Sequence, residues 1–304
     1  MNLTQWKSAG LIFSYRGHAV FYRDEGAGDV LVCIHGFPTA SWDWHRLWPA
    51  LIERFRVIAP DMLGFGFSDK PKTYAYSLLD QATLHEVLLD SLGIRQVHIL
   101  AHDYGDTVAQ ELLARYEDRL SWNGRGIEIK SVCLLNGGIF PESHRPRLMQ
   151  KMLLSPLGPL VARLASERMF RRSFSAIFAP ETRPSEDELH EFWALIQHND
   201  GMRVMHRIID YMRERRIYRQ RWVGVLQQTR VPLRMINGAV DPVSGAHVVA
   251  RYRQLIPNPD VIVLDTVGHY PQLEAPQAVL AAFFEFVDRV RLGQGCVSSR
   301  SLLE

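Results

Sequence analysis

Apolar runs that resemble strands alternate with runs that resemble helices, and this alternation restricts the fold more than any other feature of the chain. Up to residue 138 the expected strands span residues 11–17, 18–26, 29–36, 56–61, 96–103 and 128–138, and the expected helices span residues 41–55, 76–93 and 107–120. We expect the first two strands to pair antiparallel, and Ser41 and Gly93 to cap helices. Such alternation is typical of an α/β fold, in which helices cover both faces of a mostly parallel sheet.

The alternation stops after residue 138 and returns near residue 227. The intervening residues are rich in arginine and predict helices, among them one over 204–226, whereas residues 231–238 and 260–265 are again strand-like, which gives eight strands. We expect an α/β core in residues 1–138 and 227–292, a helical cap in 139–226 and a flexible tail in 293–304. Sheets of this class bind ligands at the carboxyl ends of their strands, so an insertion there would cover the site.

Composition and charge exclude several classes of protein. The net charge is +2 over 304 residues. A charge this small gives no reason to expect a nucleic-acid partner, and it is no firm sign of membrane binding. The N-terminus lacks the pattern of a secretory signal and no apolar stretch is long enough to span a bilayer, so a cytoplasmic monomer or homodimer is the default. Cys33 and Cys133 lie in apolar strands and are expected to be buried, whereas Cys296 is a candidate free thiol.

Residues 98–112, HILAHDYGDTVAQEL, predict a sharp turn between a strand and a helix. Where such a turn holds a nucleophile, small residues flank the central side chain because strand and helix approach closely. Ala101 and Gly105 are the small residues, and Asp103 occupies the central position. Since Asp103 would also fit as a simple helix N-cap, the turn alone does not decide its role.

Two further residues follow in the order that α/β-hydrolases use for a catalytic triad. Asp241 in INGAVDPVSG and His269 in DTVGHYPQLEAP each come directly after an expected strand. Taken singly, Asp241 is a turn aspartate before Pro242, and His269 is one of twelve histidines. Three residues on separate loops in the correct order favour the triad Asp103, Asp241 and His269.

The third expected strand leads into a loop that suits an oxyanion hole. The loop residues are His35, Gly36, Phe37 and Pro38. We expect the backbone N–H groups of Phe37 and Tyr104 to bind a developing oxyanion, with Pro38 fixing the turn. No metal and no organic cofactor is expected.

Four stretches resemble the branch of α/β-hydrolases that contains epoxide hydrolases and haloalkane dehalogenases: LVCIHGFPTASWDWHRLWPAL, RVIAPDMLGFGFSDKP, ILAHDYGDTVAQELLARY and VGHYPQLEAPQAV. More narrowly, HDYGDTVAQELL, LLNGGIFPESHRP, RWVGVL and VGHYPQLE resemble the mesoderm-specific transcript proteins of that branch. The resemblance covers roughly residues 10–290 and implies an α/β-hydrolase fold with an inserted cap.

An aspartate at the turn implies a first step unlike that of a serine hydrolase. At neutral pH Asp103 is a carboxylate without any base, because the reference pKa of aspartic acid is about 3.9. Attack on an sp3 carbon that bears a leaving group would form a covalent alkyl ester. His269, oriented by Asp241, would then activate the water that hydrolyses this ester.

The leaving group is less constrained than the nucleophile. In epoxide hydrolases cap tyrosines protonate the epoxide oxygen, and the resemblance makes Tyr218 and Tyr211 candidate proton donors. Their spacing of seven would place both on one face of a helix, and a surface or interface position is the alternative for each. Residues 139 and 140, Ile-Phe, stand where a second family tyrosine usually lies.

Haloalkane dehalogenases instead bind the halide with N–H groups, typically from a tryptophan that follows the nucleophile. Tyr104 and Phe37 occupy the corresponding positions here, and neither side chain offers an N–H. The other indoles considered are Trp42, Trp44, Trp193 and Trp222. We therefore expect hydrolysis of a small apolar epoxide by water, with dehalogenation as the alternative enzyme and a ligand-binding or signalling module as the alternative of another class.

Two other features have competing interpretations. Glu142 is an alternative triad acid, because some relatives place the acid after the sixth strand, although the motif around Asp241 is more specific. The basic run consists of Arg213, Arg215, Arg216, Arg219 and Arg221, and acidic residues interrupt it. We expect a solvated cap helix there rather than a site for an anionic partner or a membrane.

Overall fold

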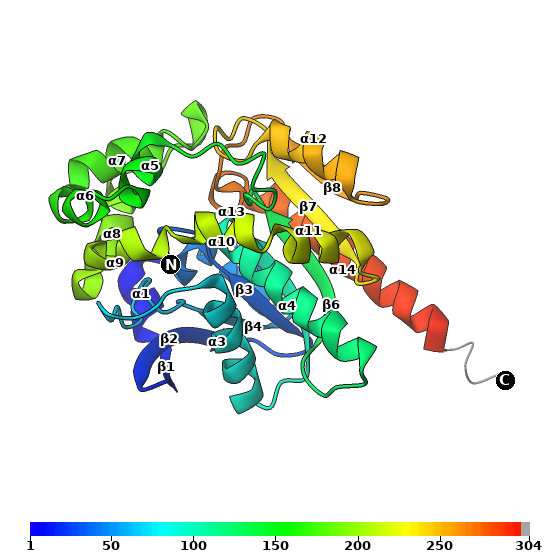
Figure 1. Ribbon diagram of the computed structural model, residues 1–304. Helices are drawn as coiled ribbons and strands as arrows, with labels where there is room; N and C mark the ends of the chain where they lie inside the picture. Colours follow the sequence, from blue (N-terminus) through cyan, green and yellow to red (C-terminus); the bar gives the residue numbers. More distant parts are fainter. Residues whose placement is uncertain (299–304) are drawn as a thin grey trace.

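The computed structural model describes residues 1–298, and its centre is an eight-stranded sheet (Figure 1). The strands are β1 (Leu11–Tyr15), β2 (His18–Glu25), β3 (Val30–Ile34), β4 (Arg56–Pro60), β5 (Gln96–His102), β6 (Glu128–Leu135), β7 (Leu233–Gly238) and β8 (Val261–Leu264). Their order is β1-β2-β4-β3-β5-β6-β7-β8, with β2 antiparallel to both β1 and β4 and the remaining neighbours parallel. This confirms the predicted α/β class, the eight strands and the antiparallel opening pair.

The helices fall into two groups, divided by where they lie in the chain. Outside the connection between β6 and β7 are α1 (Leu3–Ser8), α2 (Trp48–Ile52), α3 (Leu78–Ser91), α4 (Tyr104–Ser121), α12 (Ala246–Leu255), α13 (Pro271–Glu274) and α14 (Pro276–Ser298). Within that connection are α5 (Leu148–Leu154), α6 (Gly158–Leu164), α7 (Glu167–Ser175), α8 (Glu186–Gln197), α9 (Met202–Ile208), α10 (Tyr211–Ile217) and α11 (Arg219–Gln228). We call the connection between β6 and β7, with its helices, the helical segment.

Both faces of the central strands are buried. In β3, Val32 and Ile34 contribute to one apolar cluster, and Leu31 and Cys33 contribute to another. A parallel sheet covered on both faces requires such continuously apolar strands, which explains why these runs show no polar alternation. Cys33 and Cys133 are buried free thiols, as predicted.

The helices predicted over 41–55 and 204–226 are divided in the structure, the second into α9, α10 and α11. Residues 41–55 form a short 3-10 helix, Ser41–Trp44, followed by α2, because the backbone N–H of Ser41 donates to Asp61 at 2.7 Å and its Oγ accepts from Trp6 at 3.1 Å. The prediction that Ser41 caps one long helix was therefore wrong. Gly93, in contrast, follows α3 with a φ of 69°, the left-handed conformation expected after a helix end.

The helical segment is joined to the sheet layer at its last helix. Glu111 of α4 accepts hydrogen bonds from the Trp222 indole at 2.8 Å and from Arg221 at 2.8 Å, and Gln110 donates to the carbonyl oxygen of Trp222 at 3.0 Å. Although α11 lies within the range predicted as a cap, its packing along α4 makes it part of the layer that covers the sheet (Figure 1).

The C-terminal helix α14 continues to Ser298, so the first part of the segment predicted as a tail is helical. Residues 299–304 and the side chain of Cys296 lie outside the described residues. Among the described helices, none combines the length and the apolar character needed to cross a bilayer.

The junction of β5 and α4 requires a close approach of two backbones. A Cβ atom at Gly105, in the first turn of α4, would collide with the carbonyl oxygens of Ile34 and His35 at the end of β3. Backbone atoms of a central strand have little room to retreat. The glycine predicted from the turn pattern is therefore required sterically.

Gly105→Ala should lower the free energy of unfolding by about 1–3 kcal/mol, the usual cost of overpacking, measured by urea denaturation. Gly224→Ala in α11 is the matched control, because no atom lies within 4 Å of its added Cβ and alanine favours the helix by up to about 1 kcal/mol. Equal stability of the two variants would contradict this steric account.

Candidate active site

Asp103 lies between β5 and α4 in a strained backbone conformation. Its φ is 46° and its ψ is −102°, which a non-glycine residue rarely adopts and which costs about 1–3 kcal/mol. The backbone N–H of Asp103 donates to the carbonyl oxygen of Leu135 at 3.1 Å, which ties the turn to the end of β6. The side chain is buried and does not cap α4. The alternative of a simple helix N-cap is thus excluded.

The loop after β3 lies directly against this turn. The N–H of Phe37 donates to Asp103 Oδ2 at 3.3 Å, and Tyr104, as the first residue of α4, has an N–H without a partner inside the helix. His35 holds the loop, because its Nδ1 donates to the carbonyl oxygen of Gly36 at 2.8 Å and its Nε2 accepts from the N–H of Met62 at 3.0 Å. Two amides predicted to bind an oxyanion are therefore next to the Asp103 carboxylate.

Gly36 and Pro38 occupy the same loop. A Cβ at Gly36 would lie 2.6 Å from Nδ1 of His102, so only glycine lets the loop approach β5 this closely. Pro38 follows Phe37 through a cis peptide bond and lines the cavity described below.

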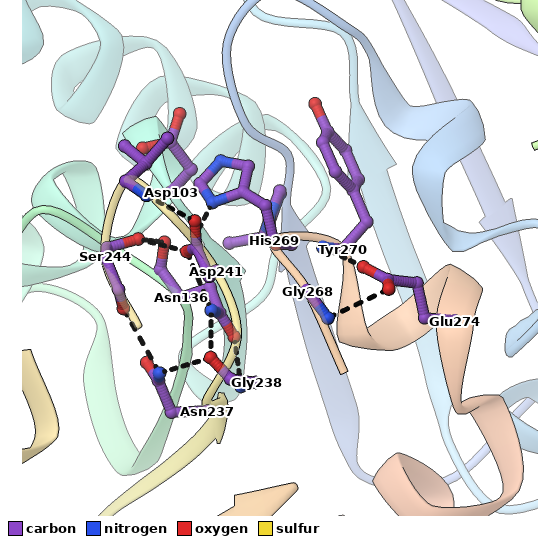
Figure 2. A network of polar contacts seen from close by, with 12 residues as sticks. Asp103, Asn136, Asn237, Gly238, Asp241, Ser244, Gly268, His269, Tyr270 and Glu274 are labelled. Carbon is purple, nitrogen blue, oxygen red and sulfur yellow. Dashed lines mark hydrogen bonds and ion pairs between the residues drawn. The ribbon is translucent and has the colours of Figure 1, made fainter. Parts of the chain in front are cut away.

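Asp241 and His269 form a hydrogen-bonded pair (Figure 2). Nδ1 of His269 donates to Asp241 Oδ2 at 2.8 Å, which leaves its Nε2 for other contacts. Asp241 also accepts from Asn136 Nδ2 at 2.9 Å, from Ser244 Oγ at 2.8 Å and from the N–H of Val243 at 2.7 Å. With its oxygens engaged in this way, the carboxylate has a fixed position. Figure 2 shows Asp103 beside this pair.

The loop that carries His269 is fixed from two sides. His102 Nε2 donates to the carbonyl oxygen of His269 at 2.8 Å, and Glu274 accepts from the backbone N–H groups of Gly268 and Tyr270 (Figure 2). On the opposite side, the N–H of His269 donates to the carbonyl oxygen of Ile177 in the helical segment at 2.9 Å. The position of the imidazole thus depends on both β5 and the helical segment.

Buried charges set the protonation of these groups. Burial raises the pKa of Asp103, but the Arg215 guanidinium and His269 outweigh burial and hold its pKa below the ordinary value. Burial likewise raises the pKa of Asp241, and His269 overcomes this and lowers it to about 2. For His269 burial lowers the pKa, whereas the carboxylates of Asp241 and Asp103 raise it to about 9. At neutral pH the site therefore holds two carboxylates and an imidazolium.

Arg215 supplies the second positive charge and corrects the interpretation of the basic run. Its side chain is buried, not solvated: Nε donates to Thr107 Oγ1 at 2.8 Å, and Nη2 donates to the carbonyl oxygen of Asp103 at 2.9 Å. Nη2 also lies 3.7 Å from the Oδ1 atom of Asp103. The spacing of four between Tyr211 and Arg215 places both on one face of α10. This spacing was the sequence signal that Arg215 is buried beside Tyr211, and the run of charges made it easy to overlook.

The other arginines of the run fit the solvated interpretation better. Arg213 pairs with Asp210, Arg219 with Glu142, and Arg221 with Glu111 and Asp118. Glu142 is therefore engaged in ion pairs with Arg219 and Arg251 at the protein surface, and Asp241 is the acid bonded to His269.

The two candidate tyrosines have different environments. Tyr211 is buried, and its ring centroid lies 5.0 Å from that of Tyr104 and 5.8 Å from that of Phe37, so it sits over the predicted oxyanion hole. Its hydroxyl makes no hydrogen bond of ordinary geometry within the described chain, although the Gln150 side chain lies near enough to lower its pKa. Tyr218 instead lies in the break between α10 and α11 and packs on Trp222. The break invalidates the prediction that both tyrosines share one helical face.

His144 is a site residue that the sequence analysis did not single out. Among the described residues neither of its ring nitrogens has a partner, and its Nδ1 and the Nη1 atom of Arg215 would each lie 2.6 Å from a Cβ at Gly138. Burial, with Arg215 nearby, lowers the pKa of His144 to about 3, so the ring is neutral. Its position in LLNGGIFPESHRP, after a strand that ends at the site, was the available signal.

A mostly apolar cavity of about 120 Å³ adjoins the site. Phe37, Pro38 and His269 form its inner end, and the helical segment supplies most of its walls, including Met149, Leu153, Met169, Phe170, Phe174 and Trp193. Its polar wall residues are few, so it suits an apolar ligand. Within the described residues no cluster of three His, Cys, Asp or Glu side chains could hold a metal ion.

Comparisons with known proteins agree with this architecture. The profile of the alpha/beta hydrolase fold family matches residues 29–276. The human mesoderm-specific transcript homolog protein is 46% identical over 297 residues, covering 94% of this chain and 88% of that protein.

Solved structures with the same fold include enzymes of both predicted types. A structure of the epoxide hydrolase CorEH superposes with a TM-score of 0.76 at 20% identity, covering 92% of this chain and 99% of that one. A haloalkane dehalogenase variant, DbeA-M1 from Bradyrhizobium elkanii, superposes with a TM-score of 0.79 at 19% identity, covering 94% of this chain and 98% of that one. At identities of 19% and 20% the similarity shows a shared fold and does not show a shared activity. The chain belongs to the alpha/beta hydrolase fold family.

Proposed function

We propose that this α/β-hydrolase uses Asp103 as its nucleophile, with His269 and Asp241 completing the triad, and that it hydrolyses an epoxide to a diol without a cofactor. The observation that carries the proposal is the ionised carboxylate at the strained turn, placed beside two backbone amides and the His269–Asp241 pair. A carboxylate needs no base to attack, so in this proposal the histidine acts in the second step.

In the first step an oxygen of the Asp103 carboxylate attacks a ring carbon of the epoxide, and the bond from that carbon to the epoxide oxygen breaks. Tyr211, with its unpartnered hydroxyl above the oxyanion hole, donates a hydrogen bond and then a proton to the departing oxygen. Arg215 contacts the Tyr211 ring at 4.6 Å and offsets the negative charge that this transfer leaves. The product is an alkyl ester on Asp103.

In the second step water attacks the carbonyl carbon of the ester while Nε2 of His269 accepts its proton. The oxyanion forms on the side chain of Asp103 and receives hydrogen bonds from the amides of Phe37 and Tyr104. Collapse of this intermediate breaks the ester bond, and the imidazolium returns a proton to the diol oxygen. The new carboxylic acid of Asp103 gives its proton to His269, which restores the carboxylate and the imidazolium of the resting site.

Ester formation also prepares His269 for this second step. The free enzyme holds His269 as an imidazolium partly because of the negative charge on Asp103. Once Asp103 is esterified that charge is gone, so the pKa of His269 falls, and its proton passes through water to the Tyr211 phenolate, which leaves the neutral imidazole as the base. The same charge that stabilises the resting site is removed by the first step of the reaction.

Dehalogenation is the second candidate, and one observation favours it. Trp193 lines the cavity, whereas Trp222 donates its indole N–H to Glu111 and is not available to a halide. A halide would also find the positive charge of Arg215 nearby. Release of diol from terminal epoxides, compared with release of halide from 1-haloalkanes of the same chain length, separates the two activities.

His269→Gln should permit the first step and prevent the second, so that an alkyl ester accumulates on Asp103. Intact-protein mass spectrometry after incubation with 1,2-epoxyhexane should show one added epoxide mass, and peptide mapping should locate it at Asp103. His190→Gln, at an exposed position, is the control and should show no adduct.

Asp103→Ala should abolish both turnover and adduct. Hydrolysis that survives this change would overturn the aspartate nucleophile. Tight ligand binding without product, unchanged in Asp103→Asn, would instead favour a ligand-binding or signalling module.

Tyr211→Phe should slow epoxide opening by roughly a hundredfold, the usual contribution of one general acid. Tyr218→Phe is the matched control and should retain activity within about twofold, because Tyr218 packs on Trp222 away from the oxyanion loop. The measurement is the single-turnover rate of adduct formation in the His269→Gln background. Equal rates in both tyrosine variants would remove Tyr211 from the mechanism.

Asp103→Asn should lower the pKa of His269 from about 9 toward its ordinary value of 6.5, because one of the three carboxylates that raise it is neutralised. The imidazole should therefore lose its proton at lower pH in this variant, as seen in an NMR titration of the ring nitrogens. Asp200→Asn, at an exposed position, is the control. An unchanged pKa in Asp103→Asn would show that the carboxylate does not act on His269.

A further inference from the structure

The exposed apolar side chains of this protein are concentrated on α5, α6 and α7. Of the fifteen large apolar side chains that are exposed among the described residues, six lie between residues 148 and 169. They are Leu148, Met152, Leu157, Leu160, Leu164 and Met169, and three of them, Leu148, Leu157 and Leu164, are 73%, 64% and 67% exposed. Figure 1 shows these three helices together at one corner of the molecule. An apolar group of this kind usually marks an interaction site.

The same helices carry unpaired positive charge. Residues 145–172 contain seven Lys and Arg residues but one acidic residue, Glu167. Arg171 pairs with Glu167 and Glu186, whereas the six exposed cations of the stretch form no ion pair within the described chain. These six are Arg145, Arg147, Lys151, Arg163, Arg168 and Arg172.

This surface differs from the basic run of α10 and α11. Arg213, Arg219 and Arg221 of that run each pair with a carboxylate of the protein itself. On α5–α7 the positive charges are left for an external anion, and exposed leucines and methionines lie among them. The combination of cations and long apolar side chains on short helices is typical of segments that lie in the interface of a membrane.

We propose that α5, α6 and α7 form a surface that binds anionic lipid bilayers, with the exposed leucines and methionines among the acyl chains and the Lys and Arg side chains at the lipid phosphates. The charge decides between this partner and a second copy of the chain, because two such surfaces face to face would oppose twelve cations. The helices are too short to span a bilayer and lie along its surface.

The inner faces of α5 and α7 line the cavity. Met149 and Leu153 of α5 and Phe170 and Phe174 of α7 form its wall, which reaches His269 at the other end. A membrane bound to the outer faces would thus lie close to an apolar chamber that can accept a lipophilic molecule.

Sedimentation with lipid vesicles tests the proposal on the full chain. We expect binding to vesicles of phosphatidylcholine with about 30% phosphatidylserine, little binding to phosphatidylcholine alone, and release in about 0.5 M NaCl. Replacing Leu157, Leu160 and Leu164 together by serine should weaken the partition coefficient by roughly tenfold or more. The matched control replaces Leu120 and Trp122 by serine. These two side chains are similarly exposed at the end of α4, and the control variant should bind the vesicles as the unaltered protein does.

A charge variant provides an independent measurement. Lys151→Glu, Arg163→Glu and Arg168→Glu combined should abolish binding to the anionic vesicles, and thermal unfolding should confirm that all variants remain folded. Asp103→Ala should bind as the unaltered protein does, since this surface does not depend on the chemistry proposed for Asp103. Hydrolysis that survives in Asp103→Ala, with vesicle binding intact, would therefore count against the proposed function alone.

Two results would overturn the proposal. One is absence of binding to the anionic vesicles, or binding that neither set of substitutions weakens. The other is a dimer in analytical ultracentrifugation without lipid that the leucine variant dissociates while vesicles remain unbound, because a second copy would then cover the surface.

Discussion

The mutual compensation of buried charges around Asp103 is the constraint on which the site depends. Asp103 and Asp241 are balanced by His269 and Arg215, and all four side chains are buried. An isolated buried charge costs several kcal/mol, whereas a set with matched partners is tolerated. The four residues come from four separate parts of the chain. The fold therefore has to bring all of them together, because each charge is stable in the buried site only beside its partners.

Arg215 gives the helical segment a direct part in this balance. It contacts both the backbone oxygen and the carboxylate of Asp103, and its Nε bonds to Thr107 in α4. Without this arginine the pKa of Asp103 would rise, because burial raises it and Arg215 is the largest of the charges that lower it. The helices inserted between β6 and β7 therefore help to keep the carboxylate ionised as well as enclosing the cavity.

Much of this arrangement could be predicted from the sequence. A mostly parallel sheet with helices on both faces follows from apolar runs that alternate with helices, and parallel strands bring the residues after β5, β7 and β8 to the same end of the sheet. That geometry made Asp103, Asp241 and His269 recognisable as a set. The steric need for glycine at position 105 followed from the same turn pattern.

The helical segment was harder to predict. Helical periodicity depends on neighbouring residues in the sequence, whereas the contacts that place these helices are made with distant parts of the chain. Sequence periodicity cannot show where a helix breaks, so Tyr211 and Tyr218 were assigned to one face although Tyr218 ends α10. A run of arginines resembles a solvated face, and only the tertiary structure shows that Arg215 points inward. His144 was missed because only the tertiary structure shows that it lies near Arg215 and that its ring nitrogens have no partner among the described residues.

The helical segment is fastened to Asp103 and His269, the groups proposed to be catalytic, and this limits how a ligand can reach them. Ile177 accepts the backbone N–H of His269, and Arg215 bonds to Asp103, so displacing the segment as one body would disturb both groups. The stretch of α5 and α6 lies outside these two attachments. If the proposed reaction takes place here, exchange of substrate and product by local displacement of α5 and α6 would leave Asp103 and His269 in position, and the site would not have to be rebuilt in each cycle.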